Sequence, residues 1–512
     1  MYVLMQEKKP HSLLSKVAMA LLVLGVLWSC AQTEVMPETG GDTPEAVAFE
    51  AQMLNVARDT RAGRMGELTA DNLKAADAGF GVFACNTGKA PWNTWKTGTA
   101  SLMNFMFNQQ VAWENDLWVY SPVKYWPNGV DAANASDTPS HTATEKDVQY
   151  LSFFAYAPYV ETTPSTGVVT DDDTQGIVGM TANSGKAKDA SLTYRTSNVT
   201  PFDPTKSVDL LWGVRGAFNY QETDGTVNSV TTLGASHNID LTKQTVDERV
   251  SFLFKHALSK FTITVQGLFD HTDNDDTSPE YPVDVDDNTK ILIESVDFDD
   301  SPLFKQGKMY LAPATDDAEE PTWEDLTEKG TPALSIRGTD INEDLSDTYM
   351  VEAVSKSYHR DYLEDKANAA DAKTLFDALP RGVTHTEQSL FNDDETYYLV
   401  IPNKKHIADH SDDVMKIHMV YDVITYDPNL KLNTPKYFSI VKNDITATFS
   451  SAFAFEANKS YKLRLQPGLT TVKFEVAVGE WDTPITLDPL VIDWQIETHE
   501  YNIGYDSDDS TD

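Results

Sequence analysis

The sequence predicts an all-β protein with two β-sandwich domains in tandem. Short stretches of alternating apolar and polar residues recur along the chain, and polar, turn-rich segments separate them. Helix-type spacing is sparse, and its best example is 367–379. A hydrophobic content of 41% suits real cores, and 512 residues exceed what one core usually supports. These features favour β-sandwiches over a parallel α/β sheet.

The first thirty residues predict a lipoprotein signal. Lysines precede the apolar run 17–27, and Cys30 follows a serine just after it. The run is too short to span a membrane comfortably, and a small residue before cysteine matches the lipobox of bacterial lipoproteins. We therefore expect residues 1–29 to be removed and Cys30 to be lipidated. The alternatives are an ordinary signal peptide with an incidental cysteine, or a buried helix.

A first strand is predicted soon after the polar tether 33–44. Val47, Phe49 and Ala51 alternate with less apolar neighbours, which gives the strand one apolar face. The segment that follows, 55–64, carries three arginines and little apolar content. We expect it to form an exposed loop.

Later strands are predicted in two series. The first series comprises 79–84, 110–120, 148–156, 208–214 and 250–265, with 165–189 as one of its turn-rich connections. The second series comprises 290–298, 308–312, 349–354, 396–402, 415–426, 437–441, 445–450, 460–466 and 471–478. The charged stretch 270–288 lies between them, so we expect one domain over 62–268 and another over 290–480.

The charge and the cysteine content exclude some classes of protein. A formal net charge of −39 repels phosphate backbones and disfavours nucleic-acid binding. Cys85 is the only cysteine besides Cys30, so the mature chain is predicted to have no intrachain disulfide. Cys85 lies on an alternating strand with no histidine nearby, which favours a buried structural thiol over a nucleophile.

The search for catalytic or metal-binding motifs finds none that is convincing. His406 and His410 have the spacing of a zinc-binding helix, but Ile407 stands where a metalloprotease has its glutamate, so we expect a polar surface loop. The acidic runs 171–173 and 284–287 lack the spacing of a calcium loop. Phosphate loops and nucleophile elbows are also missing. We predict no enzyme, no cofactor and no metal.

Several short motifs follow one another in an order that resembles the fimbrillin-like, type V pilin family of outer-membrane lipoproteins. After the lipobox and the early strand, these motifs are Thr60-Arg-Ala62, Trp126-Pro127, Leu151-Ser-Phe-Phe-Ala-Tyr-Ala-Pro158, Asp209-Leu-Leu-Trp212, Phe252-Leu-Phe-Lys-His-Ala-Leu-Ser-Lys260, Asn458-Lys-Ser-Tyr461 and Gly479-Glu-Trp481. Each motif is short, but together they span nearly the whole chain.

The resemblance implies two transthyretin-like β-sandwich domains and a fimbrial role in adhesion. It also implies export to the outer membrane with lipid on Cys30, cleavage between Arg61 and Ala62 by an arginine-specific surface protease, and polymerisation with other pilin subunits by strand exchange. Residues 30–61 then form a propeptide that includes the first strand. Arg58 and Arg64 are equally basic, so the cut site stays open among the three arginines.

Strand exchange requires a donor strand, and the C-terminal extension 481–512 offers one. Leu490, Ile492, Trp494 and Ile496 share one face of an extended segment that precedes an acidic tail. The alternative is that 485–496 is simply the last strand of its own domain.

A second function from another class is a surface-anchored glycan-binding lipoprotein. Its candidate sugar platform consists of Trp92, Trp95, Trp113 and Trp118, because exposed aromatic rings stack on ligands. Such residues more often belong to a core, so a fimbrial subunit is the first prediction.

Overall fold

The fold is known from a computed structural model, in which most of the chain from Glu45 onward is described. The described residues are 45–53, 68, 70–75, 79–99, 101–127, 149–163, 166–169, 175–197, 207–220, 227–231, 237–243, 249–267, 287–298, 300–330, 372–379, 382–390, 397–430, 437–449, 453–468, 472–481 and 495–498. All but Glu45 belong to one compact unit, Ala46–Asp512. Strands dominate this unit, which confirms the all-β prediction, whereas the transthyretin-like strand order stays a prediction.

The first pair of sheets contains a seven-stranded and a four-stranded sheet. The larger sheet has the order β1 (Phe49–Met53), β13 (Val250–His256), β10 (Leu211–Arg215), β5 (Tyr150–Ala157), β2 (Phe80–Gly88), β3 (Met106–Glu114) and β4 (Leu117–Val119). The smaller sheet has the order β17 (Trp323–Lys329), β16 (Phe304–Tyr310), β9 (Ser191–Arg195) and β8 (Gly176–Met180). Side chains such as Phe83, Tyr156, Leu192 and Met309 form the core shared by the two sheets.

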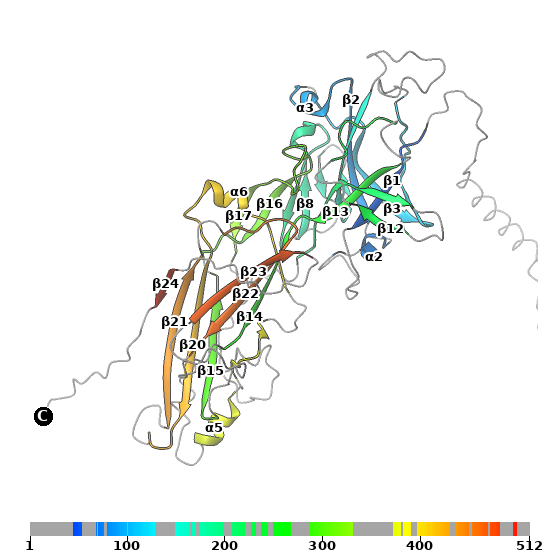
Figure 1. The fold of residues 1–512 in the computed structure, drawn as a ribbon. Helices are drawn as coiled ribbons and strands as arrows, with labels where there is room; N and C mark the ends of the chain where they lie inside the picture. The colour runs from blue at the N-terminus through cyan, green and yellow to red at the C-terminus, as the bar shows by residue number, and fades with distance from the viewer. Residues whose placement is uncertain are drawn as a thin grey trace, which may run out of the picture. The chain divides into compact units, whose positions relative to one another are not determined.

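The second pair of sheets forms another sandwich (Figure 1). One sheet has the order β18 (Gln388–Ser389), β14 (Ser259–Val265), β22 (Lys459–Pro467) and β23 (Val472–Glu480), and β19 (Tyr398–Val400) also pairs with β14. The other sheet has the order β15 (Thr289–Asp297), β20 (Lys416–Tyr426), β21 (Phe438–Thr448) and β24 (Gln495–Thr498). Ile263 and Leu463 from the first sheet meet Ile293 and Tyr421 from the second in their common core.

The remaining elements are short. Two small hairpins are β6 (Thr162–Thr163) with β7 (Val168–Val169), and β11 (Ala217–Tyr220) with β12 (Val227–Thr231). The helices are α2 (Ala70–Leu73), α3 (Trp92–Trp95), η2 (Ala187–Asp189), α5 (Ala372–Ala378) and α6 (Lys404–Asp409). Within the described ranges, none of the helices has the length and apolar character needed to cross a membrane.

The seven-stranded sheet is covered by side chains on both faces. Successive residues of a strand point to opposite faces, and on β13 Phe252 joins one core while Leu253 joins the other. Phe252 lies with Phe49, Phe80 and Phe153 in the core on the face away from the four-stranded sheet. This second core is the one to which β1 contributes.

Strand pairing runs across the acidic stretch that the sequence places between two domains. β14 precedes that stretch and pairs in parallel with β22, which follows it. β16 also follows it and pairs with β9 of the first half. The chain therefore passes between the two pairs of sheets more than once.

Two predicted strands are wrong because each is two strands. The stretch 110–120 turns at Asn115 and Asp116, whose φ angles of 49° and 63° are those of a tight hairpin turn between β3 and β4. The stretch 250–265 breaks at Ala257–Leu258, and its halves, β13 and β14, belong to different sheets.

Other predicted strand and helix boundaries are partly wrong and partly right. The separate strands predicted at 437–441 and 445–450 are one strand, β21, and the connection predicted at 165–189 contains β7 and β8. By contrast, β15 and β20 lie where the alternation predicts them. The predicted helix 367–379 is present as α5 over its described part, and 349–354 lies outside the described residues.

Candidate functional site

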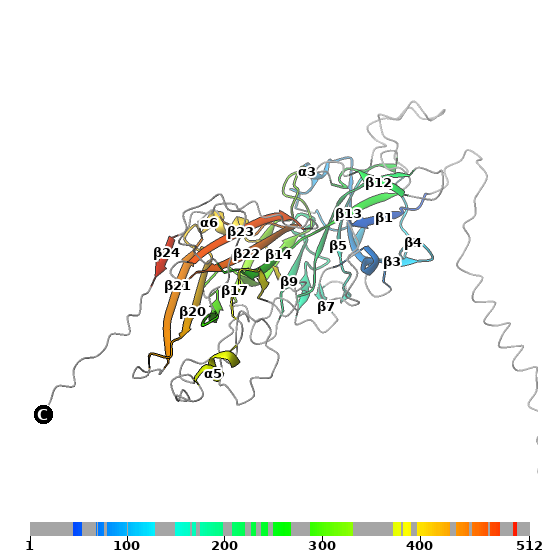
Figure 2. The ribbon, with the colours of Figure 1, turned by 60° about the horizontal axis from the view of Figure 1, so that its bottom comes forward.

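The first strand, β1, occupies an edge of the seven-stranded sheet. It pairs in parallel with β13, from Phe49 opposite Val250 to Met53 opposite Phe254. Figure 2 shows β1 beside β13 in the same sheet. We call the surface that β1 covers the β1 slot, and define it by the edge of β13 and the core residues under Val47, Phe49, Ala51 and Met53.

The apolar face of β1 is buried, as the alternation predicts. The exposed fractions of Val47, Phe49, Ala51 and Met53 are 1%, 1%, 4% and 8%. Burying a Val, Phe or Met side chain contributes roughly 1.5–3 kcal/mol each, before the cost of ordering the strand. An edge strand held this firmly leaves a long apolar opening if it is removed.

The centre of the β1 slot is an aromatic pocket around Phe49. The Phe49 ring centroid lies 5.2 Å from that of Tyr120, 5.9 Å from Phe153, 6.2 Å from Phe252 and 6.4 Å from Phe80. Aromatic pairs at such distances add to the stabilisation from burial alone. The pocket therefore favours a large ring at this position of any strand that fills the slot.

The residues just before β1 are held by a segment other than β13. The Val47 N–H donates to the Lys124 carbonyl over 2.8 Å, and the Tyr120 hydroxyl donates to the Val47 carbonyl over 2.7 Å. Ala46 forms an antiparallel bridge with Tyr125. These partners lie on the segment that follows β4, outside the strands of the sheet.

The outer face of β1 carries Glu50, opposite Ser251 of β13. Partial burial raises the pKa of the Glu50 carboxyl, while the nearby Arg249 guanidinium acts to lower that pKa. The surroundings of this position therefore disfavour the charged form of Glu50 relative to water, and Arg249 offsets only part of that effect.

The chain beyond β1 leads to the predicted processing sites. Arg61 and Ala62 lie outside the described residues, as does the predicted lipidation site, Cys30. The first described residue after them is Leu68, whose N–H donates to the buried Asp209 carboxylate over 2.9 Å. The same carboxylate oxygen lies 2.7 Å from Nδ1 of His256 on β13. β1 and Leu68, which flank the arginine-bearing stretch in the sequence, are therefore both held by contacts with the fold.

The network around Asp209 is a feature that the sequence did not single out. Asp209 and His256 belong to two motifs of the predicted resemblance, but their contact is visible only in the fold. The His256 ring also stacks on Trp481 with centroids 4.0 Å apart, next to the start of the C-terminal extension.

The predicted donor segment is described only at its end. Leu490, Ile492 and Trp494 lie outside the described residues. Ile496 belongs to β24, which pairs with the last residues of β21 in the same chain, opposite Ala447. β24 is one of the two edge strands of its sheet, and β15 is the other (Figure 2).

Cys85 is buried in a core, as predicted. Its exposed fraction is 0%, and burial raises the pKa of its thiol. The Sγ atom lies 3.2 Å from Sδ of Met103. A thiol in this position is a packing group rather than a nucleophile.

The prediction of a surface loop at His406 and His410 is wrong, because residues 404–409 form α6. The two imidazole rings stack with centroids 4.4 Å apart. His406 Nε2 forms a hydrogen bond of 2.7 Å with the Asp413 carboxylate. The helix forms because Ile407 is buried against the fold while its neighbours reach solvent. In the part of the chain that the structure describes, no group of three or more acidic, histidine or cysteine side chains is arranged to hold a metal.

The four tryptophans proposed as a sugar platform do not form one. Trp92 and Trp118 are buried, and Trp95 and Trp113 pack against cores. Trp113 and Trp118 stack edge to face across the β3–β4 hairpin, with ring centroids 5.1 Å apart.

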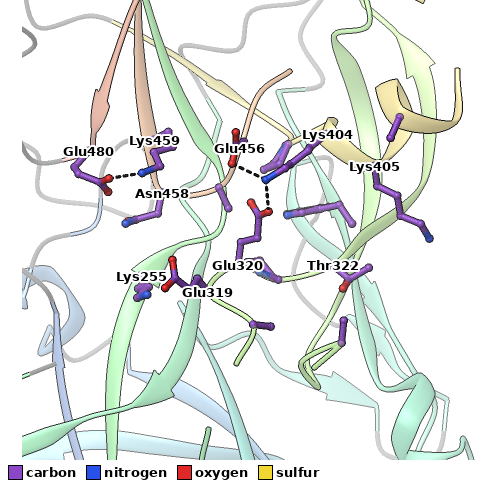
Figure 3. Close-up of a pocket in the computed structure, with 17 residues that line it drawn as sticks. Lys255, Glu319, Glu320, Thr322, Lys404, Lys405, Glu456, Asn458, Lys459 and Glu480 are labelled. Carbon is purple, nitrogen blue, oxygen red and sulfur yellow. Dashed lines mark hydrogen bonds and ion pairs between the residues drawn. The ribbon is translucent and has the colours of Figure 1, made fainter. Parts of the chain in front are cut away.

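A cleft of about 630 Å³ lies near α6 and β17. Figure 3 shows Lys404 reaching Glu320 and Glu456, with distances of 3.2 Å and 2.8 Å, and Lys459 paired with Glu480. Lysine and glutamate side chains are equally represented in its lining, so the cleft does not select a ligand by charge.

The chain is similar in sequence to a known fimbrium subunit. No protein-family model matches the chain. The fimbrium subunit Fim1C of Phocaeicola vulgatus is 24% identical over 452 residues, which cover 88% of this chain and 92% of that subunit. This similarity confirms the resemblance that the short motifs predict.

Two solved structures are also similar over most of the chain. A fimbrial protein from Bacteroides vulgatus is 17% identical, with a TM-score of 0.46, and the match covers 85% of this chain and 99% of that one. The C-terminally truncated tip fimbrial protein Mfa3 from Porphyromonas gingivalis is 8% identical, with a TM-score of 0.25, and the match covers 80% and 97%.

Proposed function

We propose that this chain is a structural or tip subunit of a cell-surface fimbria, assembled by exchange of β1 for a strand of another subunit. The observation that carries the proposal is the β1 slot, in which an edge strand with a fully buried apolar face precedes an arginine-bearing segment. The similarity to a fimbrium subunit along 88% of the chain supports the same reading. The function is adhesive and architectural, without catalysis.

The proposed pathway begins with export as a lipoprotein. Lipid on Cys30 holds the precursor at the outer membrane, and an arginine-specific protease then cuts between Arg61 and Ala62. Loss of β1 exposes unpaired backbone groups along β13 and the apolar floor beneath them, and such an edge pairs readily with another strand. The subunit then joins an extracellular fimbrium.

The first experiment tests the cut. Arg61→Ala should block both maturation and the formation of SDS-resistant ladders, because β1 then stays covalently attached. Arg58→Ala and Arg64→Ala are the matched controls and should mature normally. Ladders of normal length from Arg61→Ala would show that this bond is not the one used.

The N-terminal residue of protein recovered from the cell surface gives a direct measurement. Ala62 would show that the bond after Arg61 is cut, which is the step that must precede removal of β1. Cys30 would instead indicate a permanently anchored protein and would contradict the proposed assembly.

A second experiment tests the donor. Deleting Leu490–Asp512 should abolish ladders while the monomer stays folded, because β24 is joined to its sheet only through β21 among the described strands. Circular dichroism of the monomer is the control for folding. Unchanged ladders would remove this segment from the proposal.

A further inference from the structure

A group of lysine side chains lies where α3 and the turn after it meet η2. We propose that this surface, together with the ring of Trp95, binds an acidic polysaccharide, a sugar chain that carries carboxylate or sulfate groups. We call the surface the lysine patch, and define it by Lys89, Lys96, Lys186 and Lys188. The patch lies outside the β1 slot and does not require β1 to leave, so the inference is independent of the proposed assembly.

Backbone contacts join the two chain segments that carry these lysines. The Ala187 N–H of η2 donates to the Ser101 carbonyl over 2.7 Å. Leu102, the next residue, forms an antiparallel bridge with Lys186. The segment that follows α3 is therefore fixed against η2, which carries Lys186 just before it and Lys188 within it.

The turn after α3 is also closed on itself. The Ser101 hydroxyl donates to the carbonyl of Trp95 and, over 3.0 Å, to the carbonyl of Gly98. Lys96 directly follows α3, and Lys89 lies three residues before it. A helix of only four residues separates these two lysines, so both are held close to η2.

The lysine patch differs in charge from the rest of the chain. The chain has 79 acidic and 40 basic residues, yet 79–113 and 175–188, the two segments that contain the patch, have four lysines and no acidic residue. Three of the four side chains are exposed, and that of Lys96 is half-buried. Among the described residues, none of the four lysine side chains has an ion pair or a hydrogen bond. Their charges are therefore available to a ligand.

Three carboxylates lie near α3 and η2. Asp240 accepts from the Trp92 N–H over 2.7 Å, and Asp316 accepts from the side-chain amide of Asn93 over 2.8 Å. Asp189 is exposed on η2. The four lysines outnumber these carboxylates, so the local charge is positive.

The acidic remainder of the chain does not cancel this local charge at physiological salt. The Debye length there is about 8 Å, so carboxylates much farther than this from the patch are screened from a ligand bound to it. A single exposed ion pair contributes little to binding. A polymer with many anionic groups engages several lysines at once, and its affinity rises with their number. The patch therefore favours a polymeric ligand over a small anion.

The surroundings of the lysines suit a sugar chain. Part of the Trp95 ring packs against a core and the rest is exposed, and aromatic rings stack on the apolar faces of sugars. Thr94 and Thr97 are exposed beside it and offer hydroxyl groups to those of a sugar. Duplex DNA carries about one charge per 1.7 Å, and a net charge of −39 repels so dense a row of phosphates. An acidic polysaccharide has its charges farther apart.

Binding to immobilised polymers tests the class of ligand. The full-length chain is passed in about 0.15 M salt over dextran sulfate, polygalacturonate and unmodified dextran. We expect it to bind one or both of the acidic polymers and not dextran. Binding to dextran sulfate alone would identify sulfate as the recognised group, and binding to polygalacturonate alone would identify carboxylate. A failure to bind either polymer, or equally tight binding to duplex DNA, would overturn the inference.

A set of glutamine variants tests the surface. Replacing all four lysines of the patch should weaken binding to the acidic polymer about tenfold, because several contacts are lost together. The matched control removes the same charge from four lysines that already pair with carboxylates, and should leave the affinity nearly unchanged. Its substitutions are Lys308→Gln, Lys373→Gln, Lys405→Gln and Lys459→Gln. Equal weakening by the two sets would show that net charge, and not the patch, controls binding.

Arginine at the same four patch positions is the control for charge. This variant should keep the binding, and its loss in a folded arginine variant would contradict recognition by charge. Near-UV circular dichroism shows whether each variant is folded. Sedimentation shows whether the glutamine variant of the patch changes self-association. If it does so without changing polymer binding, the patch is a contact between copies and the inference fails.

The role of the Trp95 ring is measured separately. Trp95→Phe should keep most of the affinity for the acidic polymer, whereas Trp95→Ala should lose it, because alanine has no ring to stack on a sugar. Thermal unfolding of both variants is the control, since this ring also packs against a core. Equal affinities of the two folded variants would overturn the assignment of a sugar to this ring.

Discussion

Replacing Phe49 by alanine should weaken the precursor without weakening the fibre. The Phe49 side chain is 1% exposed and contacts four aromatic rings. Truncation of a buried phenylalanine costs about 3–5 kcal/mol, which combines lost transfer free energy and the cavity left behind. We expect the loss of unfolding free energy for Phe49→Ala to fall in this range. The reason is that β13 is part of a sheet and cannot move into the cavity that the missing ring leaves. In the fibre, another strand has replaced β1, so the same substitution should leave fibre stability unchanged.

The assay compares denaturant midpoints of two forms of the variant. The unprocessed monomer is followed by tryptophan fluorescence, and the fibre by loss of ladders after incubation in denaturant. Glu50→Gln, on the opposite face of β1, is the control and should shift the monomer by less than about 0.5 kcal/mol. An equal loss of stability in monomer and fibre would mean that β1 stays in place, and would refute the exchange.

Two further predictions concern the second pair of sheets. Although burial opposes protonation, hydrogen bonds to Asp444 and Asp297 raise the pKa of His418, so its contribution to stability is complete below the unfolded pKa of about 6.5 and is lost as pH rises through the higher folded value. His418→Gln should therefore flatten the pH dependence of the unfolding midpoint between pH 6 and 8, and an unchanged slope would contradict this assignment. Lys290 donates from Nζ to the carbonyls of Phe376 and Leu379 at the end of α5, over 3.0 Å and 2.6 Å. Lys290→Met should cost roughly 0.5–1.5 kcal/mol and speed amide exchange in α5, and unchanged exchange would count against it.

The sequence predicts strands well where one chain segment forms one strand. The alternation around Phe49 and along β20 is read directly from the residues, because the side-chain period of a strand is local. The hairpin at Asn115–Asp116 had a local signal too, since these residues tolerate positive φ, but the apolar residues on either side read as one continuous strand.

Pairing between strands that are distant in the sequence cannot be predicted from the local alternation of residues. β1 and β13 are separated by roughly two hundred residues, and nothing in either segment specifies a parallel partner. The break at Ala257–Leu258 carries no glycine or proline, so the change of sheet is decided by tertiary packing. The contact of Asp209 with His256 likewise depends on the fold, although both residues lie in motifs that the sequence analysis quoted.

The burial of β1 implies that cutting the chain and opening the slot are separate events. Before the cut, the covalent link keeps β1 at a high effective concentration beside β13. After the cut, Val47, Phe49 and Met53 still bury their side chains, and those contacts contribute roughly 1.5–3 kcal/mol each. We therefore expect the β1 fragment to stay bound to the processed subunit during gel filtration, and to be released when a peptide spanning 488–499 is added. Mass spectrometry of the eluted subunit measures the fragment directly. Release of the β1 fragment on cleavage alone, without the peptide, would show that the contacts of β1 are too weak to keep it in the slot. The cut by the protease, and not the arrival of the incoming strand, would then determine when assembly begins.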